Sequence, residues 1–129
     1  MDAEAKVKKY AGQSRHYLLN ASKFIDAGDS EKASEFLWGS LAEAVKAVVL
    51  SKGFQLKKHG EIWTYVENLT KELEDKGIYD AFRHAHDLHI NFYESDIELR
   101  GVRRMAEDIK VVQDKLLNLI PGEGLLWKG

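Results

Sequence analysis

The sequence predicts an all-α fold, an antiparallel up-and-down bundle of about five helices. Hydrophobic residues recur at intervals of three and four along most of the 129 residues, which is the spacing of amphipathic helices. The one proline, Pro121, lies near the end, so no earlier helix is interrupted by proline. The segments between the periodic stretches are short, and short connections favour antiparallel neighbours. We expect a single domain over residues 1–129, with a short tail from about residue 121.

The first helix is expected from near Ala3 to Ala27. Apolar or small residues stand at helical spacing along it: Val7, Tyr10, Ser14, Tyr17, Leu18, Ala21, Phe24 and Ile25. Gly28 ends this helix, and Asp29 or Ser30 can accept the first free amide hydrogens of the next one. The first connection is therefore the short turn at residues 28–30.

The second helix is expected to run to about Lys52, where Gly53 closes it. It has apolar residues on several sides: Phe36, Leu37, Trp38, Leu41, Val45, Val48 and Val49. A helix that is apolar on several sides is buried on several sides, so this one is expected at the centre of the bundle. A basic loop from Phe54 to His59 leads to a third helix over roughly Gly60 to Asp75.

The next break is expected at Lys76-Gly77. The fourth helix follows, carries three of the five histidines and ends near Ser95-Asp96. A fifth helix is expected from about Ile97 to Ile120, where Pro121 stops it. Its apolar residues are spaced three, four, three, four and three: Val102, Met105, Ile109, Val112, Leu116 and Leu119. That seam is typical of nearly parallel or antiparallel helix packing.

The composition excludes several classes of protein. There is no cysteine, which excludes disulfides, thiolate catalysis and cysteine metal sites. The net charge of −2 gives no global attraction to nucleic acid, although local basic patches can still bind it. The N-terminus is too charged for a signal peptide, and the longest apolar stretch, residues 44–50, is too short to cross a bilayer. We expect a cytoplasmic protein without membrane contact.

The fourth predicted helix is the best candidate for a site. At about 100° per residue, His86, His89 and Tyr93 fall within roughly 60° of one another. Apolar residues lie beside them: Phe82, Ala85 and Phe92. Imidazole gains or loses a proton near neutral pH, and a polar stripe in an apolar face needs a partner or a function to offset its desolvation. No glycine-rich phosphate loop, Ser-His-Asp set or carboxylate pair competes with it.

Four segments together resemble the HEPN superfamily of small helical proteins. They are the Gly-Asp-Ser turn at 28–30, the alanine-rich stretch 42–47, His59-Gly60, and Leu-His-Ile-Asn-Phe-Tyr-Glu at 88–94. The chain is most similar to an archaeal branch, the PaREP-type proteins, whose members carry a similar Leu-His-x-Asn-Phe-Tyr-Glu segment. The resemblance spans Tyr10 to about Leu119. It implies a bundle related to the C-terminal domain of kanamycin nucleotidyltransferase.

The resemblance implies two alternative roles. Many HEPN proteins are metal-independent, homodimeric ribonucleases, often toxins, with an arginine and a histidine four to six residues apart; here five residues separate Arg83 from His89. His89 would be general acid or base toward a ribose 2′-hydroxyl, and Arg83 would stabilise charge on the phosphate. Other members are silent partners of minimal nucleotidyltransferases that help to bind nucleotide or substrate, and this role would use His86, Asn91, Tyr93 and Glu94. We favour the binding role, since Arg83 lies about 120° around the helix from His89.

Each candidate residue also has a structural interpretation. His89 lies near the middle of the apolar face. It is equally well explained as a core histidine whose ring is hydrogen-bonded to a carbonyl or to a tyrosine hydroxyl. Arg83 is more simply explained by a surface pair with Asp87, one turn along. Tyr93 can be explained as a core residue whose hydroxyl is hydrogen-bonded, and Asn91 as a residue exposed to solvent. His84 is expected in solvent.

A metal or other cofactor is not expected. His86 and His89 are one turn apart, but no histidine has an acidic residue three positions before it, as di-iron bundles require. Carboxylates would have to come from elsewhere, such as Glu43 or Glu35.

Two further features bear on partners. The basic clusters at 57–59 and 100–104 would hold RNA phosphates if they converged in space, and each is otherwise a solvated face. Three aromatic residues look exposed, and a small domain would struggle to cover them alone: Trp38, Trp63 and Trp127. We therefore expect a homodimer.

Overall fold

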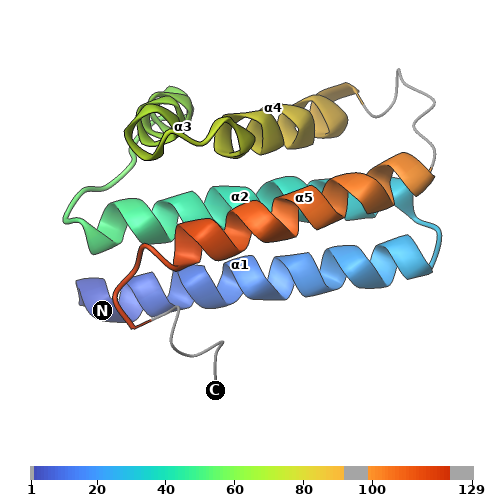
Figure 1. The fold of residues 1–129 in the computed structure, drawn as a ribbon. Coiled ribbons are helices and arrows are strands. Elements are labelled where there is room, and N and C mark those ends of the chain that lie inside the picture. The colour runs from blue at the N-terminus through green and yellow to red at the C-terminus, as the bar shows by residue number, and fades with distance from the viewer. Residues whose placement is uncertain (1, 92–98, 123–129) are drawn as a thin grey trace.

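The computed structural model describes residues 2–91 and 99–122, and this part of the chain is helical throughout, with short turns between the helices. The helices are α1 (Ala3–Asp26), α2 (Ser30–Ser51), α3 (His59–Leu73), α4 (Lys76–Asn91) and α5 (Leu99–Leu117). The predicted all-α bundle of about five helices is confirmed (Figure 1).

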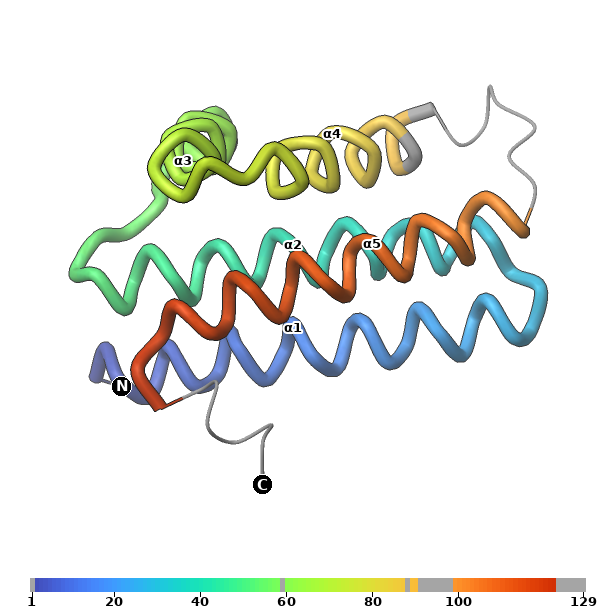
Figure 2. The backbone as a smooth tube through the Cα atoms, viewed as in Figure 1, coloured from blue at the N-terminus to red at the C-terminus, as the bar shows by residue number. Residues whose placement is uncertain are grey.

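Four of the helices lie along one direction, and the fifth crosses them. α1 and α2 form an antiparallel hairpin, α5 lies against both, and α4 covers α2 and α5 on the other side (Figures 1 and 2). α3 is seen end-on in the same view, so it runs across the bundle at the start of α4. α2 contacts all four other helices, which confirms its predicted central place.

The turn between α1 and α2 follows the sequence prediction. Gly28 takes a φ of 80°, a left-handed conformation that glycine adopts without strain. Asp29 is the N-cap of α2, and its Oδ1 accepts the amide hydrogen of Lys32 at 3.1 Å. The carboxylate therefore satisfies one of the free amides at the start of the central helix.

The turn between α3 and α4 differs from the prediction. The break is at Glu74-Asp75 rather than Lys76-Gly77, because Glu74 takes the left-handed conformation (φ 52°) that ends α3. Asp75 then caps α4, since its Oδ1 accepts the amide hydrogen of Gly77 at 3.0 Å. Gly77 is consequently a first-turn residue of α4 and not a helix breaker.

The centre of the α1–α2–α5 layer contains a small polar network within an aliphatic core. The Ser14 hydroxyl donates to the Ser40 carbonyl at 2.6 Å, and the Gln113 amide donates to the Ser14 hydroxyl and carbonyl at 2.9 Å each. All three side chains are buried. The network joins the three helices at one level and satisfies the polar groups that packing has removed from water.

The predicted seam of α5 is confirmed. Val102, Ile109, Val112 and Leu116 are buried, and Met105 and Leu119 are partly buried against the same core. The predicted end of the fourth helix near residue 95, the start of the fifth at residue 97 and Trp127 lie outside the described residues.

Candidate functional site

His86 packs against a pair of tryptophans from different helices. Its ring centroid lies 5.1 Å from that of Trp38 on α2 and 5.1 Å from that of Trp63 on α3, with both rings nearly edge-on to it. The two indoles are themselves 6.0 Å apart. Tyr79 packs on Trp63 and Phe82 packs on Trp38, each at right angles or close to it. We call these five residues the aromatic cluster, and it fixes α4 to α2 and α3.

The expectation that Trp38 and Trp63 are exposed is wrong. Both are half-buried, because each covers the other and His86 fills the space beside them. The sequence shows large apolar side chains but not which of them meet across helices. The argument for a homodimer from uncovered tryptophans is therefore removed for these two residues.

His89 is exposed, which corrects its predicted place in the middle of a buried face. Its angular position matches that of Phe82 and Ala85, which are both fully buried one and two turns earlier. Ile90 beside it is 56% exposed. Helical periodicity gives the side of a helix on which a residue lies. Burial also requires a neighbouring element that packs on that side, and His89 and Ile90 are exposed in the last turn of α4.

Arg83 forms the surface pair with Asp87 that the sequence predicted. Its Nε lies 4.0 Å from Asp87 Oδ2, and the two side chains are 68% and 57% exposed. Such a pair in water contributes only a few tenths of a kcal/mol, so Arg83 can exchange it for another anion at little cost. His84 is exposed, as predicted.

The structure does not bring Arg83 and His89 to one point. Both are exposed, but they lie about 120° apart around the helix, so they are on different sides of α4. Of the predicted ligand-binding residues, His86 belongs to the aromatic cluster. Asn91 ends α4 with a side chain outside the described part, and Tyr93 and Glu94 also lie outside it.

The two basic clusters lie at opposite ends of the molecule. The loop that carries Lys57 and Lys58 joins α2 to α3, whereas Arg100, Arg103 and Arg104 are at the start of α5 (Figure 1). They do not converge on one anion. Within residues 2–91 and 99–122, no three histidine, aspartate or glutamate side chains form a group that could hold a metal ion.

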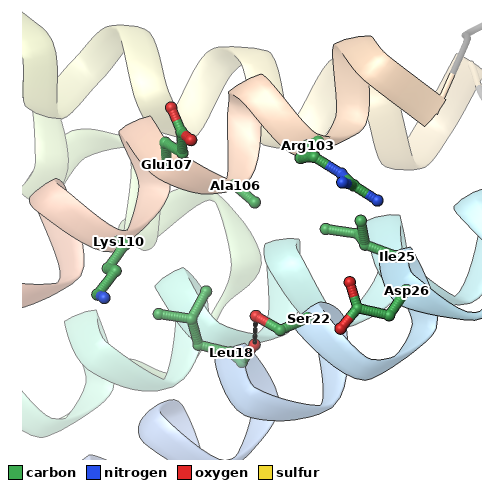
Figure 3. A pocket seen from close by; sticks show the side chains of 8 residues that line it. All are labelled: Leu18, Ser22, Ile25, Asp26, Arg103, Ala106, Glu107 and Lys110. Atoms are coloured by element: carbon green, nitrogen blue, oxygen red, sulfur yellow. Dashed lines mark hydrogen bonds between the residues drawn. The ribbon is translucent and has the colours of Figure 1, made fainter.

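Sequence reasoning missed the hollows between helices, of which two involve α1. The first is an open groove of about 200 Å³ between α1 and α5, with Leu18, Ile25 and Ala106 as its apolar part (Figure 3). Charged side chains of both signs line the rest: Asp26, Arg103, Glu107 and Lys110. The second is a basic recess between the start of α1 and the end of α2. Both depend on which helices are neighbours, and no sequence motif marks them.

The sequence profile described as the archaeal PaREP1/PaREP8 family matches residues 9–113. The chain belongs to this family. The matched region includes the whole of α2, α3 and α4, and with them the aromatic cluster, so the candidate site lies inside the family domain. The predicted PaREP-type resemblance is thereby confirmed. No curated protein matches the chain.

Across the described ranges, none of the helices combines the length and the apolar character needed to cross a bilayer.

Proposed function

We propose that this PaREP family member is an HEPN-like binding subunit for a nucleotide or RNA, acting with a separate minimal nucleotidyltransferase. The observation that carries the proposal is the contrast between two sets of side chains on α4. Tyr79, Phe82 and His86 fix the helix to α2 and α3 through the aromatic cluster, whereas Arg83 and His89 are exposed to solvent. Polar side chains on a firmly anchored helix are well placed to bind, because little conformational entropy is lost when they do so.

The charge of the exposed side chains favours a phosphate ligand. Arg83 offers a planar guanidinium that binds phosphate oxygens in pairs, and its present partner Asp87 is a weakly held surface carboxylate. His89 and His84 add ring nitrogens on other sides of the same helix. Ile90, exposed beside His89, supplies an apolar contact for a base or for the protein partner.

Binding is favoured over catalysis because Arg83 and His89 point away from each other on one chain. A base and a phosphate-stabilising group must lie within hydrogen-bond reach of the same substrate. The alternative, a metal-independent homodimeric endoribonuclease, has one observation in its favour: both side chains are exposed, so a second subunit could reach them.

The test compares RNA and nucleotide binding by the wild type, Arg83→Gln and His89→Ala, by fluorescence anisotropy at low salt. We expect each variant to bind about tenfold more weakly or worse, the loss expected for a hydrogen bond to a charged group. His16→Ala is the matched control, since His16 is an exposed histidine on α1. Equal binding by all four proteins, or no binding by the wild type, would overturn the proposal.

The same samples decide between the two roles. RNA cleavage without added metal, lost in both α4 variants, would indicate the ribonuclease. Mixing the two inactive variants would then restore part of the activity if each site takes Arg83 from one subunit and His89 from the other. Binding without cleavage supports the subunit role.

A further inference from the structure

The basic recess between α1 and α2 has the chemistry of an anion site. Lys6 and Tyr10 reach it from α1, Lys46 and Leu50 from α2, and Gln55 and Leu56 from the loop that follows. Its volume is about 200 Å³, and it is more enclosed than the groove between α1 and α5. The start of α1, the end of α2 and the loop to α3 meet at one end of the bundle, away from the end of α4 (Figure 1).

Three polar groups around the recess make no hydrogen bond or ion pair with another described residue: the Lys6 ammonium, the Tyr10 hydroxyl and the Gln55 amide. Lys6 and Gln55 are exposed and Tyr10 is half-buried, so water reaches these groups, and all three line the same recess. They supply two kinds of N–H donor and one O–H donor to whatever occupies it.

The Lys46 side chain is held in place by an ion pair within α2. Its Nζ donates to Glu43 Oε1 at 3.1 Å, and Glu43 is only 13% exposed while Lys46 is 42% exposed. The carboxylate takes up part of the lysine charge, which leaves Lys6 as the stronger attraction for an anion. The loop is fixed as well, because Glu61 Oε2 accepts the amide hydrogen of Lys57 at 2.9 Å.

The surroundings add positive potential and an apolar wall. Lys52 follows the last turn of α2, and Lys57 and Lys58 stand in the loop to α3, so both segments add positive charge to this end of the chain's path. Leu50 and Leu56 are half-buried and supply apolar contact area on the wall of the recess. A ligand that matches both features carries negative charge at one end and an apolar group at the other.

We propose that this recess binds a small phosphate monoester with an apolar or aromatic group, through Lys6, Lys46, Tyr10 and Gln55. A phosphate monoester is nearly doubly charged at neutral pH and has three acceptor oxygens, which suits two ammonium groups, a hydroxyl and an amide. The site is separate from the exposed residues of α4 and does not depend on the function proposed for them.

The test uses NMR titration of ¹⁵N-labelled protein with inorganic phosphate and with phenyl phosphate. We expect shifts at Tyr10, at residues 46–50 and at Gln55, with tighter binding of phenyl phosphate because its ring meets Leu50 and Leu56. Lys6→Gln is expected to weaken binding about tenfold or more. Lys8→Gln is the matched control, because Lys8 is exposed on the opposite side of α1.

Lys6 is exposed, so its replacement leaves the fold intact, and circular dichroism checks this. Lys46→Gln is a less direct test, since it leaves the half-buried Glu43 without its partner. The proposal is overturned if phenyl phosphate causes no shifts in the recess at millimolar concentration. Equal weakening in the Lys6 and Lys8 variants would also overturn it, because the effect would then be one of net charge alone.

Discussion

The α1–α2–α5 layer and the α3–α4 layer are held together in different ways. The first has an aliphatic core with the network of Ser14, Ser40 and Gln113 at its centre, fully removed from water. The second also buries apolar residues, among them Val66, Ile78 and Phe82, but adds half-buried rings, with His86 packed against the pair of Trp38 and Trp63. The exposed candidate residues of α4 are on the second layer. The two layers thus differ in the polar or aromatic contacts that supplement a shared apolar core.

The largest effect is expected from Leu41→Ala in α2. Leu41 is fully buried in the helix that contacts all the others, so its truncation leaves a cavity and costs about 2–5 kcal/mol of unfolding free energy. Urea denaturation measures this loss. Because α2 contacts both helices of the second layer, we expect both layers to unfold together, and a loss confined to one layer would contradict the central role of α2.

Ser14→Ala tests the polar network of the first layer. The change removes the hydroxyl that donates to Ser40 and accepts from Gln113, and we expect a cost of about 1–3 kcal/mol. Ser22→Ala is the matched control on the same helix. The Ser22 hydroxyl is exposed and donates only to the Leu18 carbonyl, at 3.3 Å, so its loss should stay within about 0.5 kcal/mol (Figure 3). Equal losses of unfolding free energy in the two variants would show that the buried network does not contribute to stability.

Trp63→Phe weakens the second layer alone. The phenyl ring keeps apolar contact but loses part of the indole that faces His86 and Tyr79, at a cost of about 0.5–1.5 kcal/mol. Hydrogen exchange should quicken in α3 and α4 and stay unchanged in α1 and α5. Faster exchange in all helices would mean that the two layers do not differ as described.

The smallest effect is expected at the turn between α3 and α4. The hydrogen bond from Lys115 to Asp75, 2.6 Å long, lowers the pKa of the Asp75 carboxyl below its usual value of 3.8. A lowered folded-state pKa stabilises the protein above about pH 4, and this contribution is lost as the pH falls through the folded-state pKa.

Asp75→Asn removes the charge and keeps an oxygen for the Gly77 amide, so it should cost less than about 1 kcal/mol at pH 7. The difference from wild type should shrink toward pH 3, measured by urea denaturation at each pH. A difference that stays constant with pH would exclude the ion pair as its cause.

Much of the fold could be predicted because it depends on local chemistry. The cap at Asp29 and the seam of α5 follow from residue type and spacing. The turn at Glu74 could not be predicted, because a left-handed glutamate leaves no sign in the sequence, whereas Gly77 looked like a breaker.

The candidate site was less predictable for a related reason. Periodicity placed His86 and His89 on one side of α4, but only the neighbouring helices decide that His86 packs against two tryptophans and that His89 is exposed. The surface pair of Arg83 with Asp87 was predictable, since both residues lie on one helix. The recess at Lys6 and Lys46 was not, because its residues come from segments far apart in the chain.

Hydrogen exchange of the wild-type protein with and without a mixed RNA pool tests most directly whether α4 is the binding surface. We expect slower exchange in residues 83–91 of α4, and unchanged exchange in α1 and in residues 105–117 of α5. Protection that appears only around Lys6, Lys46 and Gln55, or no protection at any RNA concentration, would contradict the assignment of RNA binding to α4.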